Sequence, residues 1–184
     1  MADRKASATA DPSPRPSGWR RMFSTWVDWT ILTPPIAAIA LAMGVLTLAT
    51  SSLRSENYEK WISQMIHVSG VLNVITAALA IVYFSILHGW RGQTFGKIAC
   101  KLRVVNMNIT PISWRKATAR AFAYYGVILL YCVVFFTKDN LLITAIGSVV
   151  TIWLLTDTIF QMADTHQHRS LHDRICGTRV IQIR

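Results

Sequence analysis

Residues 61–87 read WISQMIHVSGVLNVITAALAIVYFSIL, a run of 27 residues that contains no Asp, Glu, Lys or Arg. About 20 mainly apolar residues are enough for a helix to cross the hydrocarbon core of a bilayer. Three more runs share this character: residues 31–50 and 121–137 carry no charge, and residues 141–163 carry only Asp157. The sequence therefore predicts four transmembrane helices, over about residues 22–50, 61–88, 118–137 and 141–163.

The composition also indicates a membrane protein. Hydrophobic residues make up 52% of the 184 residues and charged residues only 15%, whereas soluble domains carry about 25% charged residues. The length favours one domain. We expect an all-α membrane fold in which two helical hairpins form the bundle.

The basic residues lie mainly on one side of this predicted bundle. The net charge is +10, and with four spans the two ends of the chain and the connection over residues 88–120 share one side. That side carries 16 of the 19 Lys and Arg residues, which by the positive-inside rule is the cytoplasmic side. The placement argues against nucleic acid as a partner and favours the lipid bilayer.

The ends of the chain are polar. Residues 1–18 are rich in Ala, Ser, Pro and charge, which predicts a disordered cytoplasmic tail without a cleavable signal peptide. Residues 19–163 are expected to form the transmembrane domain, and residues 164–184 a cytoplasmic tail of that domain. Cys100, Cys132 and Cys176 do not suggest a disulfide framework, because cytoplasmic thiols stay reduced.

An internal repeat connects the two polar segments at an offset of 76 residues. Cys100 aligns with Cys176, Arg103 with Arg179, and Val104 with Val180. Each copy follows an even-numbered span and contains a β-prone run, over residues 102–106 and 178–183. The repeat suggests that the chain is a duplication of one helical hairpin with its following strand. We therefore expect a small cytoplasmic β element in which the two strands pair and cover each other's edge.

Three motifs in order around the four spans resemble a known family. They are Arg21 with Asp28, then GQTFGK at 92–97 followed by LRVV at 102–105, then LHDR at 171–174 followed by GTRV at 177–180. Together they are similar to the RDD family of small bacterial membrane proteins, named for one arginine and two aspartates. The resemblance implies that Arg21, Asp28 and Asp173 are the matched residues and that the chain is a multi-pass protein of the bacterial cytoplasmic (inner) membrane. Some members are similar to cation/proton antiporters.

Four ionisable residues fall within or beside the predicted spans: Arg21, Asp28, Arg120 and Asp157. Of these, Asp28, Arg120 and Asp157 are expected at similar depth. An ionised side chain inside a bilayer is costly, so each needs a function or a partner. One interpretation is a proton or cation site in which Asp28 and Asp157 share raised, coupled proton affinities. The favoured interpretation is structural: Arg21 pairs with Asp28 and Arg120 with Asp157.

Asp173 lies outside the spans, in the His172-Asp173-Arg174 turn. It could cap the turn or pair with Arg179 or Lys97. We favour a contact with Arg21, because the family arginine and both family aspartates would then form one cluster.

Further candidate residues form a cytoplasmic motif: Gly92, Gln93, Thr94, Gly96, Lys97, His172, Asp173 and Arg174. The glycine–lysine segment has the wrong spacing and context for a phosphate-binding loop. His166, His168 and His172 match no established zinc spacing, so we expect no metal site and no cofactor. No arrangement of serine, histidine and acid indicates hydrolysis, and we expect no enzyme.

Two functions remain open from the sequence. The first is a non-catalytic accessory or assembly subunit of a larger membrane complex, bound to other membrane subunits or to copies of itself. Four helices hardly enclose an aqueous path alone, and seven tryptophans suit contacts with protein or lipid. The alternative is a small cation/proton antiporter-like protein that uses Asp28 and Asp157 as carriers.

Overall fold

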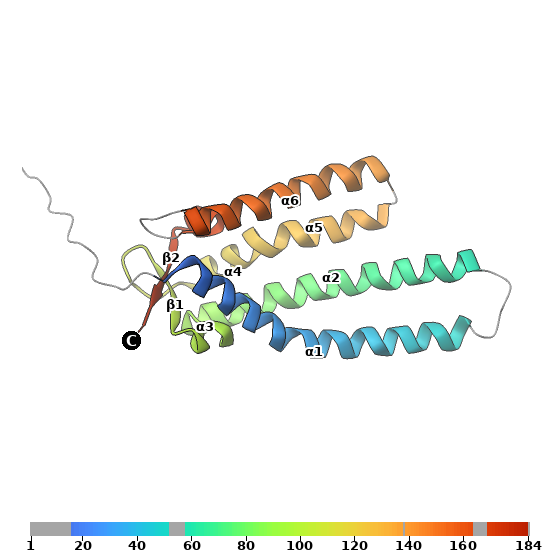
Figure 1. The fold of residues 1–184 in the computed structure, drawn as a ribbon, viewed down its shortest axis with the longest axis horizontal. Helices are drawn as coiled ribbons and strands as arrows, with labels where there is room; N and C mark the ends of the chain where they lie inside the picture. Colours follow the sequence, from blue (N-terminus) through green and yellow to red (C-terminus); the bar gives the residue numbers. More distant parts are fainter. Residues whose placement is uncertain (1–15, 52–57, 138, 164–168, 184) are drawn as a thin grey trace, which may run out of the picture.

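The computed structural model describes residues 16–51, 58–137, 139–163 and 169–183. Four long helical stretches run along the longest axis of the molecule, with a small sheet across one end (Figure 1). All four stretches are long and apolar enough to cross a membrane. The predicted fold class, four transmembrane helices with a small β element, is confirmed. The predicted disordered tail and His166 and His168 lie almost wholly outside the described residues.

Three of the four spanning stretches are single α-helices: α1 (Gly18–Ser51), α2 (Tyr58–Arg91) and α6 (Asn140–Ala163). The residues of α6 show why the bilayer is the solvent of this protein. Only Val150 and Asp157 of this helix are buried, and large side chains such as Leu141 and Ile152 are exposed over more than half of their surface. In water such exposure is costly, whereas lipid chains cover it without cost.

The helix α1 contains Pro34 and Pro35. Proline has no backbone N–H and clashes with the preceding turn, so it bends a helix. Figure 1 shows α1 bending between its two halves, so that the first half leans across the end of the bundle that carries the sheet. We call this end the sheet end.

The third span is composite. It consists of α4 (Trp114–Ala121), the π-helical turn η1 (Phe122–Gly126), α5 (Val127–Val134) and the 3₁₀ turn η2 (Phe135–Thr137). Ser113 caps its start by accepting a hydrogen bond from the Lys116 amide. A π-turn inserts one extra residue into a helix. Here it carries Tyr125, which is buried and stacks on Phe84 of α2 at a centroid distance of 4.9 Å.

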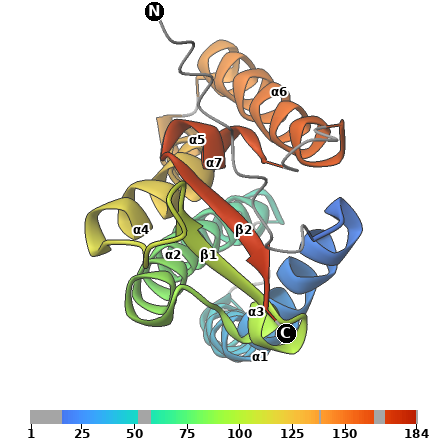
Figure 2. The same ribbon diagram turned by 90° about the vertical axis from the view of Figure 1, so that its left-hand side faces the viewer.

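The sheet end repeats one unit twice. A five-residue helix, α3 (Phe95–Ala99), precedes β1 (Leu102–Asn106), and another, α7 (Leu171–Ile175), precedes β2 (Thr178–Gln182). All four elements keep the offset of 76 residues that the sequence shows. The strands pair antiparallel across the bundle end (Figure 2), as predicted.

The sheet covers its own small core. Leu102, Val104 and Val180 are at most 5% exposed and pack with Cys100, Ile112 and Ala117. Next to the sheet, α3 contacts α1 and α4 contacts α2. The sheet therefore fixes the polar elements against the helix ends, where the ionisable residues lie.

Candidate functional site

A buried carboxylate joins three parts of the chain at the sheet end. Asp173 of α7 is fully buried and forms ion pairs with Arg21 of α1 and with Arg120 of α4. Ser170 and Thr178 donate further hydrogen bonds to it, at 2.9 and 3.2 Å. We call these five residues the Asp173 cluster. Removing one partner of such a buried pair costs about 3–5 kcal/mol, so the cluster ties the sheet end to two spanning helices.

Asp28 of α1 makes a different set of contacts. Its carboxylate accepts hydrogen bonds from the Tyr83 hydroxyl at 2.8 Å, from the Thr94 hydroxyl at 2.6 Å and from the Gly96 amide at 2.7 Å. The expected pair between Arg21 and Asp28 is therefore wrong. The three donors satisfy the buried carboxylate through hydrogen bonds alone.

Asp157 of α6 also differs from expectation. It accepts hydrogen bonds from the His172 amide at 2.9 Å and from His172 Nδ1 at 2.8 Å. The expected pair with Arg120 is wrong, because Arg120 bonds Asp173 instead. Burial and the nearby Arg120 charge lower the pKa of His172 to about 4, so the ring is neutral at pH 7 and donates its Nδ1–H to Asp157.

The two intramembrane carboxylates share one structural role. Thr94 is the N-cap of α3 and Ser170 is the N-cap of α7. Gly96 and His172 each stand two residues after the cap, where a helix has an unsatisfied amide. Asp28 accepts one of these amides and Asp157 the other. Each carboxylate thus holds the positive end of a short helix against a spanning helix.

Gly96 allows this close approach. A Cβ atom at this position would lie 1.9 Å from the Ser24 carbonyl oxygen and 2.9 Å from Asp28 Cγ. Any side chain would push α3 away from α1 and break the bond between the Gly96 amide and Asp28. The glycine is therefore required by contact between two backbones.

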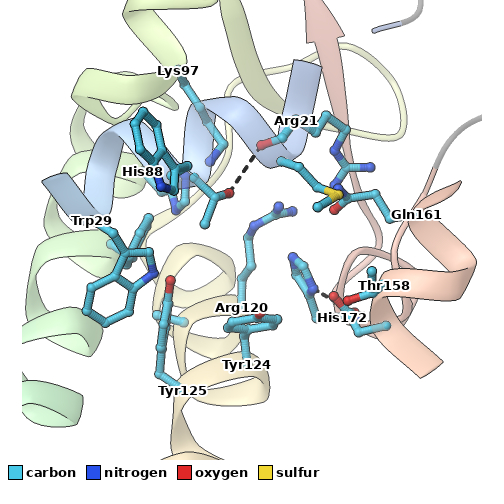
Figure 3. Close-up of a pocket in the computed structure, with 16 residues that line it drawn as sticks. Arg21, Trp29, His88, Lys97, Arg120, Tyr124, Tyr125, Thr158, Gln161 and His172 are labelled. Carbon is cyan, nitrogen blue, oxygen red and sulfur yellow. Dashed lines mark hydrogen bonds and ion pairs between the residues drawn. The ribbon is translucent and has the colours of Figure 1, made fainter. Parts of the chain in front are cut away.

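A cavity of about 300 Å³ lies beside the Asp173 cluster, lined by α1, α2, α3, α4, η1, α6 and α7. Its cationic lining comes from Arg21, Lys97 and Arg120, and Asp157 is the one carboxylate among the described residues that line it. Figure 3 shows the charged ends of Lys97 and Arg120 pointing toward each other in this space. Aromatic rings, including Trp26, Trp29 and Tyr124, complete the wall.

Lys97 and His88 are buried beside this cavity without a strong partner. Lys97 is 6% exposed, and no described carboxylate lies within ion-pair distance of its Nζ, which instead sits 5.8 Å from the centre of the Phe84 ring. Burial lowers the pKa of Lys97 to about 7, and repulsion by Arg120 contributes in the same direction. His88 is 3% exposed, and neither ring nitrogen bonds a described residue.

Comparison with known proteins gives the family. The model of the RDD family matches residues 15–177. The chain belongs to the RDD family. No curated protein matches it.

The RDD resemblance pointed to Arg21, Asp28 and Asp173 as one cluster. The structure brings Arg21 and Asp173 into contact, which is the contact that we favoured. Asp28 lies outside this cluster and has its own hydrogen bonds to Tyr83 and Thr94. The third member of the cluster is Arg120 instead of Asp28. In this RDD protein, Arg21 and Arg120 both form ion pairs with the Asp173 carboxylate.

The other predicted residues have structural contacts. Gln93 donates to the Leu102 carbonyl at 2.7 Å. Gly92 has a φ of +67° and its carbonyl accepts from the Val104 amide at 2.7 Å, which explains the glycine. Arg174 lies over the Phe160 ring at 5.0 Å. These contacts stabilise the segments at the sheet end, whereas Lys97 and His172 line the cavity.

Sequence reasoning missed Tyr83, which donates to Asp28, because it lies in an apolar helix that looked uniform. His88, at the end of the same helix, was expected at the membrane interface, and in the structure it lines the cavity. The five-residue spacing of Tyr83 and His88 gave no signal, because it turns the two side chains about 140° apart on a helix. Among the described residues, no group of three His, Cys, Asp or Glu side chains comes together as a metal site.

Proposed function

We propose that this RDD protein is a non-catalytic accessory subunit of a larger membrane complex. The observation that supports it is that groups of the protein itself bind the three carboxylates that are buried in the described part of the chain. Asp28 and Asp157 each accept from a helix amide, and Asp173 binds two arginines. A carboxylate that carries ions must exchange its partners in each cycle, and breaking these contacts would release the sheet end from the bundle.

The surface near the sheet end supports a role in contacts. Trp19, Trp26, Trp90 and Trp114 are each more than half exposed. Tryptophan is enriched both at membrane interfaces and in the central residues of protein interfaces. We propose that these rings contact headgroups and neighbouring subunits, with either another membrane protein or a second copy as the partner.

The orientation belongs to the same proposal. Most described basic residues lie at the sheet end, including the Lys97 and Arg103 segment and Arg169, Arg174 and Arg179. By the positive-inside rule this end faces the cytoplasm of a bacterial cell, and the protein lies in its cytoplasmic (inner) membrane.

One observation favours a second candidate, cation/proton antiport. The Asp157–His172 pair lines the cavity rather than lying behind its wall. A carboxylate next to a neutral imidazole can exchange a proton, and a dimer could extend the cavity into a path. In this candidate Asp157 is the carrier and Asp28 keeps α3 in place.

Two experiments separate the candidates. Affinity purification from native membranes in a mild detergent should recover a stoichiometric membrane-protein partner, or a dimer by cross-linking, if the accessory role is correct. In proteoliposomes, cation-dependent proton flux should be absent from the wild type. Flux that Asp157→Asn abolishes and the surface control Asp139→Asn retains would replace the accessory role by antiport.

A further inference from the structure

We propose that the cavity beside the Asp173 cluster binds a phosphate-class anion carried by an amphiphile, which enters from the membrane between α1 and α6. The inference goes beyond the accessory role and does not depend on it. It rests on the cationic lining, on the unpartnered groups and on the open side of the cavity.

The balance of charge in the lining favours an anion. Lys97 and Arg120 face each other (Figure 3), and Asp157, the one carboxylate among the described lining residues, is already bonded twice by His172. Asp28 and Asp173 are fully buried and do not line the cavity. An anion between Lys97 and Arg120 would relieve their repulsion at a distance where Coulomb interactions in a poorly solvated site are strong.

Donors remain available for such an anion. Both hydrogen bonds of Arg120 to described residues use Nη1, which leaves Nε and Nη2 as donors. Lys97 Nζ has the Phe84 ring but no close carboxylate, and both ring nitrogens of His88 are without a described partner. Guanidinium and ammonium groups together are the usual phosphate ligands of proteins, and buried polar groups without partners need one.

The open side points to an amphiphile. Met22 and Trp26 on α1 and Thr158 on α6 line the cavity and are also exposed on the outside of the bundle. The gap therefore reaches the membrane-facing surface between these two helices. Closer to the sheet end the helices touch, where Gln161 Nε2 donates to the Gly18 carbonyl at 3.3 Å. A headgroup can occupy the basic part while its chain lies along Trp26. Basic pockets between transmembrane helices on the cytoplasmic side bind anionic lipid headgroups.

The charge of Lys97 sets the pH dependence of this site. The groups that face it from the packed elements are Arg21 and Asp28 of α1, His88 of α2, Cys100 beyond α3, Arg120 of α4 and His172 of α7. With its pKa near 7, Lys97 is half protonated at neutral pH. An anion binds the protonated form better, so its affinity should fall as the pH rises from about 6 to about 8.

The test uses the full chain in detergent micelles with tryptophan emission as the signal, because Trp26 and Trp29 line the cavity. Phosphatidylglycerol is titrated against zwitterionic phosphatidylcholine and against inorganic phosphate. We expect a saturable change with phosphatidylglycerol at about tenfold lower concentration than with phosphatidylcholine. If inorganic phosphate alone produces the same change at the same concentration, the anion site stands but its source is soluble.

Variants assign the signal to this cavity. Lys97→Met should weaken phosphatidylglycerol binding about tenfold, whereas Lys101→Met, which removes an exposed lysine, should change it by about twofold or less. Lys97→Arg should bind and lose the pH dependence, since arginine stays charged. Equal binding of both lipids, or equal effects of Lys97→Met and Lys101→Met, would overturn the proposal. Lys97 has no ion-pair partner among the described residues, so Lys97→Met strands no buried counter-charge, and the wild-type pH profile tests the site without any variant.

Discussion

Val104 pairs with Val180 at the centre of the two-stranded sheet, and these same two residues coincide when the halves of the chain are aligned at the offset of 76. The register is therefore symmetric about this pair: Leu102 faces Gln182 and Asn106 faces Thr178. An approximate two-fold axis through the sheet relates α3 and β1 to α7 and β2. The supporting carboxylates break the symmetry, because Asp28 comes from the first span and Asp157 from the fourth.

Asp173→Asn should produce one of the largest losses of stability from a single polar substitution. It removes the carboxylate that forms ion pairs with the buried Arg21 and Arg120 side chains, at an expected cost of about 3–5 kcal/mol. Thermal or denaturant unfolding in detergent micelles measures it. The control is Asp139→Asn, at an exposed helix cap where the Asp139 side chain accepts from Leu141 and Leu142 and asparagine caps equally well. Similar stabilities of the two variants would contradict the importance of the cluster.

Gly96→Ala should separate α3 from α1, since its Cβ would meet the Ser24 carbonyl oxygen at 1.9 Å. A backbone contact cannot move aside as a side chain does, so the cost should reach about 3 kcal/mol or more. The control is Gly44→Ala in α1, where no atom lies within 4 Å of the added Cβ. There alanine should stabilise the helix by about 0.5–1 kcal/mol. Unfolding in micelles and amide hydrogen exchange of α3 report both effects, and an unchanged exchange rate in Gly96→Ala would refute the close contact.

Tyr83→Phe should lower the free energy of unfolding, because it removes one hydrogen bond to the Asp28 carboxylate. The hydroxyl donates to a charged acceptor at 2.8 Å, and such bonds contribute about 1.5–3 kcal/mol. Tyr131→Phe is the matched control, because no hydrogen bond joins that hydroxyl to a described residue. A double-mutant cycle of Tyr83→Phe with Asp28→Asn should show coupling of about 1 kcal/mol. Additive effects of the two substitutions would show that the bond contributes nothing.

Lys97 should make stability depend on pH in the alkaline range. Its pKa is about 7 in the folded protein against 10.5 in its unperturbed state, so between these values the unfolded chain binds more protons. The free energy of unfolding should therefore rise as the pH increases from about 7 to about 10.5, and the lysine should destabilise most below pH 7. Unfolding in micelles across this range measures the slope. Lys97→Met should flatten it and Lys101→Met should not; equal slopes would show that Lys97 is solvated.

The sequence was sufficient for the parts of this fold that follow from local rules. Uncharged runs identified the spans, and β-prone runs at equal offset identified the two strands. The contact between Arg21 and Asp173 followed from the resemblance to the RDD family, whereas the rule that a buried charge needs a counter-charge led to the wrong partners. The expected arginine partners of Asp28 and Asp157 were wrong. Helix spacing shows which residues share a face of a helix, but not which neighbouring segment covers that face.

The neighbour of Asp28 is decided by packing of distant segments. Gly96 brings a helix amide within 2.7 Å of the carboxylate, and an amide has no signature in the sequence. The cavity was equally hidden, because Lys97 looked like one more basic residue in a cytoplasmic loop. Its burial follows from the way α3 is clamped against α1, which depends on contacts between residues about 70 positions apart.

The position of Asp173 in the chain sets the order in which this protein can mature. Both arginines that it neutralises, Arg21 and Arg120, enter the membrane region before Asp173 leaves the ribosome, since proteins are made from the N-terminus at about 5–20 residues per second. For several seconds the nascent bundle therefore holds two arginines that still lack the Asp173 carboxylate, and an unpaired strand β1. Quality-control proteases that recognise such groups would have this interval to act, and the arrival of α7 and β2 ends it.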